Sequence, residues 1–149
     1  MKIEILSHRA EKTMALGKAI SELAKPGSTF CLTGDLGAGI TTLVRGYARG
    51  LNIKSVVQSP TFNIMKIYFD GPKPLIHIDA YRLADVDTDI GVDEYIGYET
   101  GLTVIEWPNF IERLIPQDSA EINIINIGEN DRKITIESND SAFLEALKK

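Results

Sequence analysis

Apolar positions along the chain follow two periods, and each period predicts a different kind of element. Short apolar or alternating runs predict β-strands, because successive side chains of a strand point to opposite faces of a sheet. The predicted strands cover residues 2–6, 29–32, 63–69, 75–79, 102–105, 121–127 and 132–137. Apolar residues spaced three and four apart predict helices that bury one face. The predicted helices run from a cap at Ser7 to Ala24 and over residues 43–51, 85–96, 109–114 and 141–148.

Two turn-rich segments separate neighbouring strands and predict hairpins. Asp70-Gly71-Pro72-Lys73-Pro74 lies between strands 63–69 and 75–79. Glycine and proline in such a cluster supply or fix the backbone angles that a reversal needs. The second segment, Gly128-Glu129-Asn130-Asp131, lies between the alternating strands 121–127 and 132–137. We therefore expect the chain to reverse direction at both places.

The segment Phe30–Thr42, FCLTGDLGAGITT, combines a short strand, a glycine-rich turn and the start of a helix. Glycines let the backbone adopt positive φ angles and let an anion approach, while amides at a helix N-terminus point toward it. The spacing Gly34-x-x-x-x-Gly39-x-Thr41 follows the phosphate-binding pattern G-x-x-x-x-G-K-[ST], except that Ile40 stands at the lysine position. The alternative is a glycine-rich connection without a ligand. The entropic cost of the closely spaced glycines and the hydroxyls of Thr41 and Thr42 favour a phosphate site.

Two acidic residues end predicted strands, Asp79 after one strand and Glu106 after another. In open α/β sheets, ligands bind at the carboxyl ends of the strands. Mg²⁺ prefers hard oxygen ligands, and enzymes that transfer phosphoryl groups hold it with carboxylates in such places. A single acid there is more often a solvated cap, but two of them beside a glycine-rich turn favour a magnesium site.

Four further residues have two open interpretations each. Thr61 either reaches a metal or γ-phosphate from a restricted loop, or belongs to a simple Ser-Pro turn. His77 is either a hydrogen-bonded structural histidine or part of the site. Trp107 packs either beside a nucleotide or in the core. Arg132 either contributes positive charge to phosphates or is an ordinary surface arginine.

Composition and charge narrow the class of protein. The chain has 149 residues, of which 44% are hydrophobic and 25% charged, which predicts one globular domain over residues 1–149. A net charge of −5 argues against direct attraction to nucleic acid or to anionic membrane, so any nucleic-acid role is expected to act through a partner. The only cysteine, Cys31, is expected to be a packed thiol. No apolar run has transmembrane length and no signal peptide is recognisable, so the expected location is the cytoplasm.

The segments GDLGAGITTLVRGYARGL, SPTF, HIDAYRL and IEWP occur in this order, and an early Thr13-x-x-x-Gly17 and a late Arg132-Lys133-Ile134 accompany them. Together they resemble the TsaE (YjeE) family, small bacterial P-loop ATPases of tRNA threonylcarbamoyladenosine biosynthesis. The resemblance implies an α/β, three-layer P-loop NTPase-like fold with a mixed parallel and antiparallel sheet. It implies ATP or ADP and Mg²⁺ as ligands. It also implies two protein partners, the subunits of the transferase that forms N6-threonylcarbamoyladenosine at position 37 of tRNA, with tRNA contacted only indirectly.

The resemblance also assigns roles to individual residues. It places the phosphate cradle at Gly34, Asp35, Leu36, Gly37, Ala38, Gly39, Ile40, Thr41 and Thr42. Magnesium is implied at Thr41 and Glu106, with Asp79 assisting. Residues 59–62 become a switch-like loop, so that the implied catalytic residues are Glu106, Asp79 and Thr61. Trp107 is implied as a neighbour of the nucleotide, and Thr13 and Arg132 as contacts to the nucleoside or phosphate.

The family has lysine where this chain has Ile40. A P-loop lysine bridges the β- and γ-phosphates and offsets charge that shifts during transfer. We therefore expect weakened but detectable nucleotide binding with slow or absent hydrolysis, and Arg45 and Lys66 are candidate substitutes for the missing charge. Three interpretations stay open: a working ATPase subunit, a nucleotide-responsive partner that hardly hydrolyses, and a purely structural interaction protein.

Overall fold

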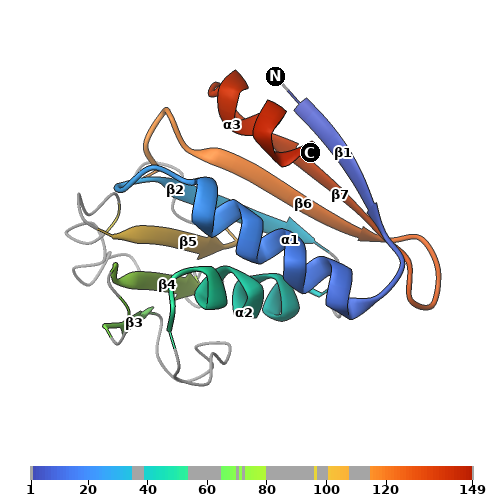
Figure 1. The fold of residues 1–149 in the computed structure, drawn as a ribbon, viewed down its shortest axis with the longest axis horizontal. Helices are drawn as coiled ribbons and strands as arrows, with labels where there is room; N and C mark the ends of the chain where they lie inside the picture. The colour runs from blue at the N-terminus through green and yellow to red at the C-terminus, as the bar shows by residue number, and fades with distance from the viewer. Residues whose placement is uncertain are drawn as a thin grey trace.

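The computed structural model describes residues 2–34, 39–53, 65–69, 71, 73–79, 96, 101–107 and 115–148. Seven strands and three helices lie in this part of the chain (Figure 1). The strands are β1 (Lys2–Ser7), β2 (Thr29–Gly34), β3 (Met65–Tyr68), β4 (Leu75–Asp79), β5 (Leu102–Glu106), β6 (Ala120–Asn126) and β7 (Arg132–Glu137). The helices are α1 (Ala10–Leu23), α2 (Ile40–Gly50) and α3 (Ser141–Leu147).

The described strands form one mixed sheet in the order β1-β7-β6-β2-β5-β4-β3. The four central strands β6, β2, β5 and β4 are mutually parallel, whereas β7 runs antiparallel to both β1 and β6. β3 pairs antiparallel with β4, so both predicted hairpins are confirmed. The predicted α/β fold with a mixed parallel and antiparallel sheet is therefore confirmed.

The three described helices cover one face of the sheet, with α1 and α2 side by side over its centre (Figure 1). Phe30 of β2 packs between two of these helices: its ring centre lies 5.6 Å from that of Tyr47 in α2 and 5.8 Å from that of Phe143 in α3. Leu32 and Val104 belong to the same buried cluster. Burial of these apolar side chains is the main stabilising contribution, at about 25 cal/mol for each Å² removed from water.

Two glycines allow α1 and α2 to approach closely. A Cβ atom on Gly17 of α1 would lie 2.1 Å from the Leu43 carbonyl oxygen, and one on Gly46 of α2 would lie 1.9 Å from the Met14 carbonyl oxygen. Both collisions would be with backbone, which cannot rotate away as a side chain can. The predicted Thr13-x-x-x-Gly17 pattern therefore has a packing reason: the glycine brings the first turns of α1 against the start of α2.

One predicted detail of α1 is wrong. Ser7 does not cap the helix; the N-cap residue is Arg9, which makes no capping hydrogen bond through its side chain. Ser7 ends β1, and its hydroxyl instead bonds the Arg9 carbonyl at 2.9 Å and the Thr13 hydroxyl at 2.8 Å. The predicted helix 109–114 and residues 85–95 of the predicted helix 85–96 lie outside the described residues, as do residues 70 and 72 of the predicted turn.

Cys31 is buried in β2, as predicted, and its environment makes it chemically inert. Burial raises the pKa of the thiol to about 11, partly opposed by a weak bond to the Ser119 hydroxyl at 3.9 Å. The thiol is therefore protonated at neutral pH, and the thiolate is the reactive form. Because the unfolded chain ionises first, the stability due to this shift should be lost as pH rises from about 9 toward 11.

We expect Cys31 to react with a disulfide reagent such as DTNB at least a hundredfold more slowly in the native protein than in guanidinium, since about two pKa units separate the two states. The absorbance change at mildly alkaline pH measures the rate. A Cys31→Ser variant, which should release no colour, provides the background. Equal rates with and without denaturant would show that the thiol is accessible and ordinary.

Candidate functional site

The carboxyl ends of three neighbouring parallel strands, β2, β5 and β4, meet at one edge of the sheet (Figure 1). Glu106 in β5 is the register partner of both Leu32 in β2 and Asp79 in β4. Gly34 ends β2 two residues after Leu32, so both acids lie at the edge where the glycine-rich segment begins. The structure thus brings together three features that are far apart in the sequence.

The other end of the glycine-rich segment opens α2. Gly39 is its N-cap residue and has φ 104°, a left-handed conformation that side chains with a Cβ atom rarely adopt. Among the described residues, a Cβ atom on Gly39 would meet no atom within 4 Å, so that part of the structure leaves the space above it open. Ile40, Thr41 and Thr42 follow in the first helical turn, whose amides have no partner within an α-helix. This is the geometry of an anion site at a helix N-terminus.

Ile40 is half-buried and packs against the hydrophobic core. The position that carries lysine in the phosphate-binding pattern is therefore used here for apolar packing. Of the two candidate substitutes, Lys66 contacts a tyrosine ring elsewhere, whereas the role of Arg45 stays a prediction. Lys66 places its ammonium 5.4 Å from the centre of the Tyr68 ring, and Tyr68 pairs with Leu75 at the far end of β4. Arg45 lies on the exposed side of α2.

A small cavity of about 90 Å³ joins the start of α2 to the start of α1 and to the β6–β7 hairpin. It is lined by Arg9, Ala10, Thr13, Gly39, Thr42, Asn130 and Arg132. The structure thus brings Thr13 and Arg132, which lie far apart in the sequence, to the glycine-rich segment. Arg9 and Asn130 were missed from the sequence, because neither belongs to a motif and only the fold places them here.

Local hydrogen bonds hold the two predicted residues of this cavity in place. The Thr13 hydroxyl is buried and bonded to Ser7, which fixes its direction. Arg132 donates from Nη1 to the carbonyl of Asp131 at 3.0 Å and to those of Gly128 and Glu129 at 3.4 Å. Arg132 therefore stabilises the hairpin turn while its positive charge lines the cavity.

Glu106 is buried, at 7% exposed, and has a specific partner. Its Oε2 atom lies 2.5 Å from Nε2 of His77, which is fully buried in β4. His77 and Glu106 share the helix-covered face of the sheet, since strands alternate their side chains and Asp79 pairs with Glu106. His77 is therefore a hydrogen-bonded histidine of the core whose partner is a candidate site residue, and its own role in the site stays a prediction.

Trp107 follows Glu106 with a strained backbone. Its φ angle is 59°, which is unusual for a bulky residue, and its amide donates to the Leu32 carbonyl at 3.2 Å. Strained backbone of this kind costs of order 1–3 kcal/mol and is concentrated at functional sites. The side chain is half-buried and directly follows β5, and its implied place beside the nucleotide stays a prediction.

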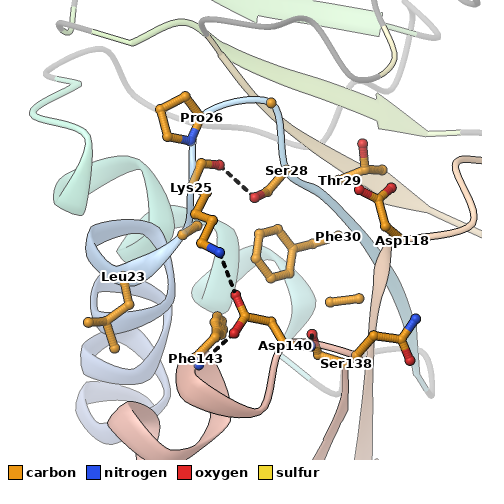
Figure 2. A pocket seen from close by; sticks show the side chains of 14 residues that line it. Leu23, Lys25, Pro26, Ser28, Thr29, Phe30, Asp118, Ser138, Asp140 and Phe143 are labelled. Carbon is orange, nitrogen blue, oxygen red and sulfur yellow. Dashed lines mark hydrogen bonds and ion pairs between the residues drawn. The ribbon is translucent and has the colours of Figure 1, made fainter.

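A larger cavity, of about 530 Å³, lies at the opposite end of β2 (Figure 2). Two of its charged groups are paired with each other, because Lys25 contacts Asp140 at 3.4 Å, and Asp140 also accepts from the Phe143 amide at 3.1 Å. The Phe143 amide, with a smaller effect of Lys25, lowers the pKa of Asp140. This carboxylate serves as the cap of α3, so the larger cavity is not the candidate site.

The donors at the ends of β4 and β5 and in the first turn of α2 are of the kinds that bind Mg²⁺. Thr41, Asp79 and Glu106 offer a hydroxyl and two carboxylates, and magnesium is usually held by one or two carboxylates with water and phosphate completing the octahedron. Among the described residues no group of three or more His, Cys, Asp and Glu side chains forms a complete metal cage. Asp35, Leu36, Gly37, Ala38 and Thr61 lie outside the described residues, so their predicted roles stay predictions.

Fold and site together define the class: an α/β protein with a mixed sheet and a candidate phosphate site between the parallel strand ends and a helix N-terminus. Comparison with known proteins makes the class specific. The sequence model of the family described as "Threonylcarbamoyl adenosine biosynthesis protein TsaE" matches residues 7–134. The chain belongs to the TsaE family.

Individual relatives agree with this assignment. The chain is 46% identical to the tRNA threonylcarbamoyladenosine biosynthesis protein TsaE of Bacillus subtilis over 125 residues, which is 84% of this chain and 78% of that protein. It is 40% identical to the protein of the same name from Aquifex aeolicus over 136 residues, 89% of this chain and 94% of the relative. The crystal structure of Bacillus subtilis YdiB superposes with a TM-score of 0.81 at 34% identity, covering 99% of this chain and 93% of that one. No helix in the described part of the chain is long and apolar enough to cross a membrane.

Proposed function

We propose that this protein is a nucleotide-binding subunit that supports formation of N6-threonylcarbamoyladenosine at position 37 of tRNA, together with the two protein subunits of the threonylcarbamoyl transferase. It would bind ATP or ADP with Mg²⁺ in the cytoplasm and hydrolyse ATP slowly or not at all. The names of its relatives supply the pathway. The observation that supports nucleotide binding is that Asp79 and Glu106 end strands beside β2, whose last residue, Gly34, begins the glycine-rich segment that opens α2.

In the proposed site, separate groups of residues bind the phosphates, the metal ion and the rest of the nucleotide. Backbone amides at the start of α2, beside the open space at Gly39, would contact the phosphates. Thr41, Glu106 and Asp79 would hold Mg²⁺, which when bound neutralises phosphate charge. The small cavity with Thr13 and Arg132 would receive the neighbouring part of the nucleotide.

The alternative is a purely structural interaction protein. An empty glycine-rich segment would need neither the left-handed Gly39 nor two acids at the adjoining strand ends. The presence of Ile40 instead of lysine favours the interpretation between a working ATPase and a structural protein: a subunit that responds to bound nucleotide but hardly hydrolyses it. Losing one charge-assisted hydrogen bond to phosphate costs roughly 1.5–3 kcal/mol, which weakens binding by about ten- to a hundredfold without abolishing it.

Calorimetric titration of ADP and ATP in the presence of Mg²⁺ tests nucleotide binding directly. We expect saturable binding that weakens in Gly39→Ala, because a Cβ atom at φ 104° is strained and would stand in the open space. Gly27→Ala is the matched control, since Gly27 also has a positive φ, 88°, but lies at the other end of β2. No saturable binding at millimolar nucleotide would contradict the proposal.

The pathway is tested separately in a bacterial strain depleted of its own TsaE. Expression of this chain should restore threonylcarbamoyladenosine, measured by mass spectrometry of digested tRNA. Glu106→Gln expressed at the same level should restore less, since an amide binds Mg²⁺ more weakly than a carboxylate. Failure of the unaltered chain to restore the nucleoside, at a protein level matching that of the native TsaE, would contradict this part of the proposal.

A further inference from the structure

The His77–Glu106 pair links two strands in the interior of the protein. His77 is fully buried and Glu106 is 7% exposed, and their Nε2 and Oε2 atoms are 2.5 Å apart. A buried carboxylate is costly unless it is hydrogen-bonded. His77 is therefore well placed to govern how Glu106 presents its carboxylate to anything bound at the sheet edge.

The direction of this hydrogen bond follows from the atoms that surround the ring. An ionised carboxylate only accepts, so Nε2 of His77 carries the hydrogen and donates to Oε2 of Glu106. Nδ1 of His77 is buried and has no hydrogen-bond partner among the described residues. The hydrogen bond to Glu106 is thus the only one that holds the ring among the described residues, and it is made through Nε2.

We propose that His77 is a positioning residue for Mg²⁺ binding: it holds one carboxylate oxygen of Glu106, so that the other remains for the cation. This inference rests on the proposed function and names a residue that contributes without touching metal or nucleotide. Without the imidazole, the Glu106 carboxylate would be free to rotate and would have to be ordered again whenever the metal binds. Partners of this kind typically change metal affinity by about ten- to a hundredfold.

The experiment compares the dissociation constant of ADP with Mg²⁺ and with EDTA. We expect the gain in affinity that Mg²⁺ provides to fall by about ten- to a hundredfold in His77→Leu, while binding in EDTA stays unchanged. His77→Gln should recover most of the gain, because its amide nitrogen can donate from nearly the same position as Nε2. His8→Gln is the control, since His8 is the only other histidine and lies exposed, paired with Asp131.

A merely structural role for His77 would lower thermal stability in both variants and leave the gain from Mg²⁺ intact, which would overturn the inference. Failure of His77→Gln to recover the gain, while remaining folded, would also overturn it. If the unaltered protein bound nucleotide with the same affinity in Mg²⁺ and in EDTA, this inference alone would be overturned. Absence of nucleotide binding would overturn the proposed function and this inference with it.

A second measurement needs neither a variant at His77 nor a ligand. In protein labelled with ¹⁵N-histidine, two-bond correlations of the rings reveal which nitrogen carries the hydrogen, and His8→Gln assigns the two rings. We expect Nε2 of His77 to carry a hydrogen. Absence of a hydrogen on Nε2 would overturn the proposal, because His77 could then not donate to Glu106.

Discussion

Replacing Ile40 with lysine should raise ATP turnover by about 10²–10³-fold, the range found when a single oxyanion-stabilising donor is removed or restored. Nucleotide affinity should rise by about ten- to a hundredfold, as expected for one charge-assisted hydrogen bond to phosphate. The expectation follows from the position of residue 40. It is the first residue of α2, directly after the left-handed Gly39, in a site that otherwise keeps its hydroxyls and acids.

The substitution should be tolerated by the fold. Ile40 is half-buried and touches the core from its edge, so a lysine can keep part of this contact with its aliphatic stem while its ammonium reaches solvent or phosphate. We expect only a small loss of stability in the absence of nucleotide. With ADP and Mg²⁺ present the variant should be the more stable protein, because tighter binding to the native state raises its stability.

Phosphate release at saturating ATP measures turnover, and thermal unfolding with and without ADP measures binding. Ile40→Met is the matched control, because methionine has comparable reach and no charge. The lysine variant should gain in both measurements and the methionine variant in neither. A folded Ile40→Lys protein with no gain would favour the purely structural interpretation of this chain over both nucleotide-dependent ones.

Much of the arrangement at the strand ends was predictable, because it depends on short sequence patterns that identify single elements. Short apolar runs that end in Asp79 and Glu106, and glycines that precede a helix, each identify an element and its end. Parallel strands then bring these ends to one edge, so a correct list of elements is nearly enough to place Glu106 beside Asp79. The hairpin before Arg132 was predictable for the same reason, since its turn residues stand between alternating strands.

The contacts that hold the site residues were not predictable in this way. The bond between His77 and Glu106 joins residues 29 positions apart and depends on register, because a shift of one residue would turn one side chain to the other face. The hydrogen bond between the hydroxyls of Ser7 and Thr13 was not predicted, because a serine before a helix is equally well suited to be its cap. Arg9 and Asn130 reach the small cavity only through the packing of α1 against α2 and the hairpin.

That packing leads to the second large prediction, that Gly46→Ala will destabilise the protein by about 2–3 kcal/mol and lower Tm by roughly 5–10 °C. In an isolated helix the same change would stabilise by up to about 1 kcal/mol, because alanine is the better helix former. Here the added Cβ atom would lie 1.9 Å from the Met14 carbonyl oxygen and 2.7 Å from its carbon. Only a shift of one whole helix can relieve this contact, so overpacking outweighs propensity.

The shift of α1 relative to α2 should also change the geometry of the candidate site. Met14 is the neighbour of Thr13, so moving α1 away from α2 separates Thr13 from Gly39 and Thr42 across the small cavity. We therefore expect Gly46→Ala to weaken nucleotide binding, as measured by calorimetry below the lowered Tm, even though residue 46 lines neither the cavity nor the strand edge. Gly128→Ala is the control, because its Cβ atom would meet only the Asp131 side chain, at 3.0 Å, in an exposed turn. Equal Tm values for the two variants would show that the helices can separate freely, and the glycines would then not be what brings Thr13 to the start of α2.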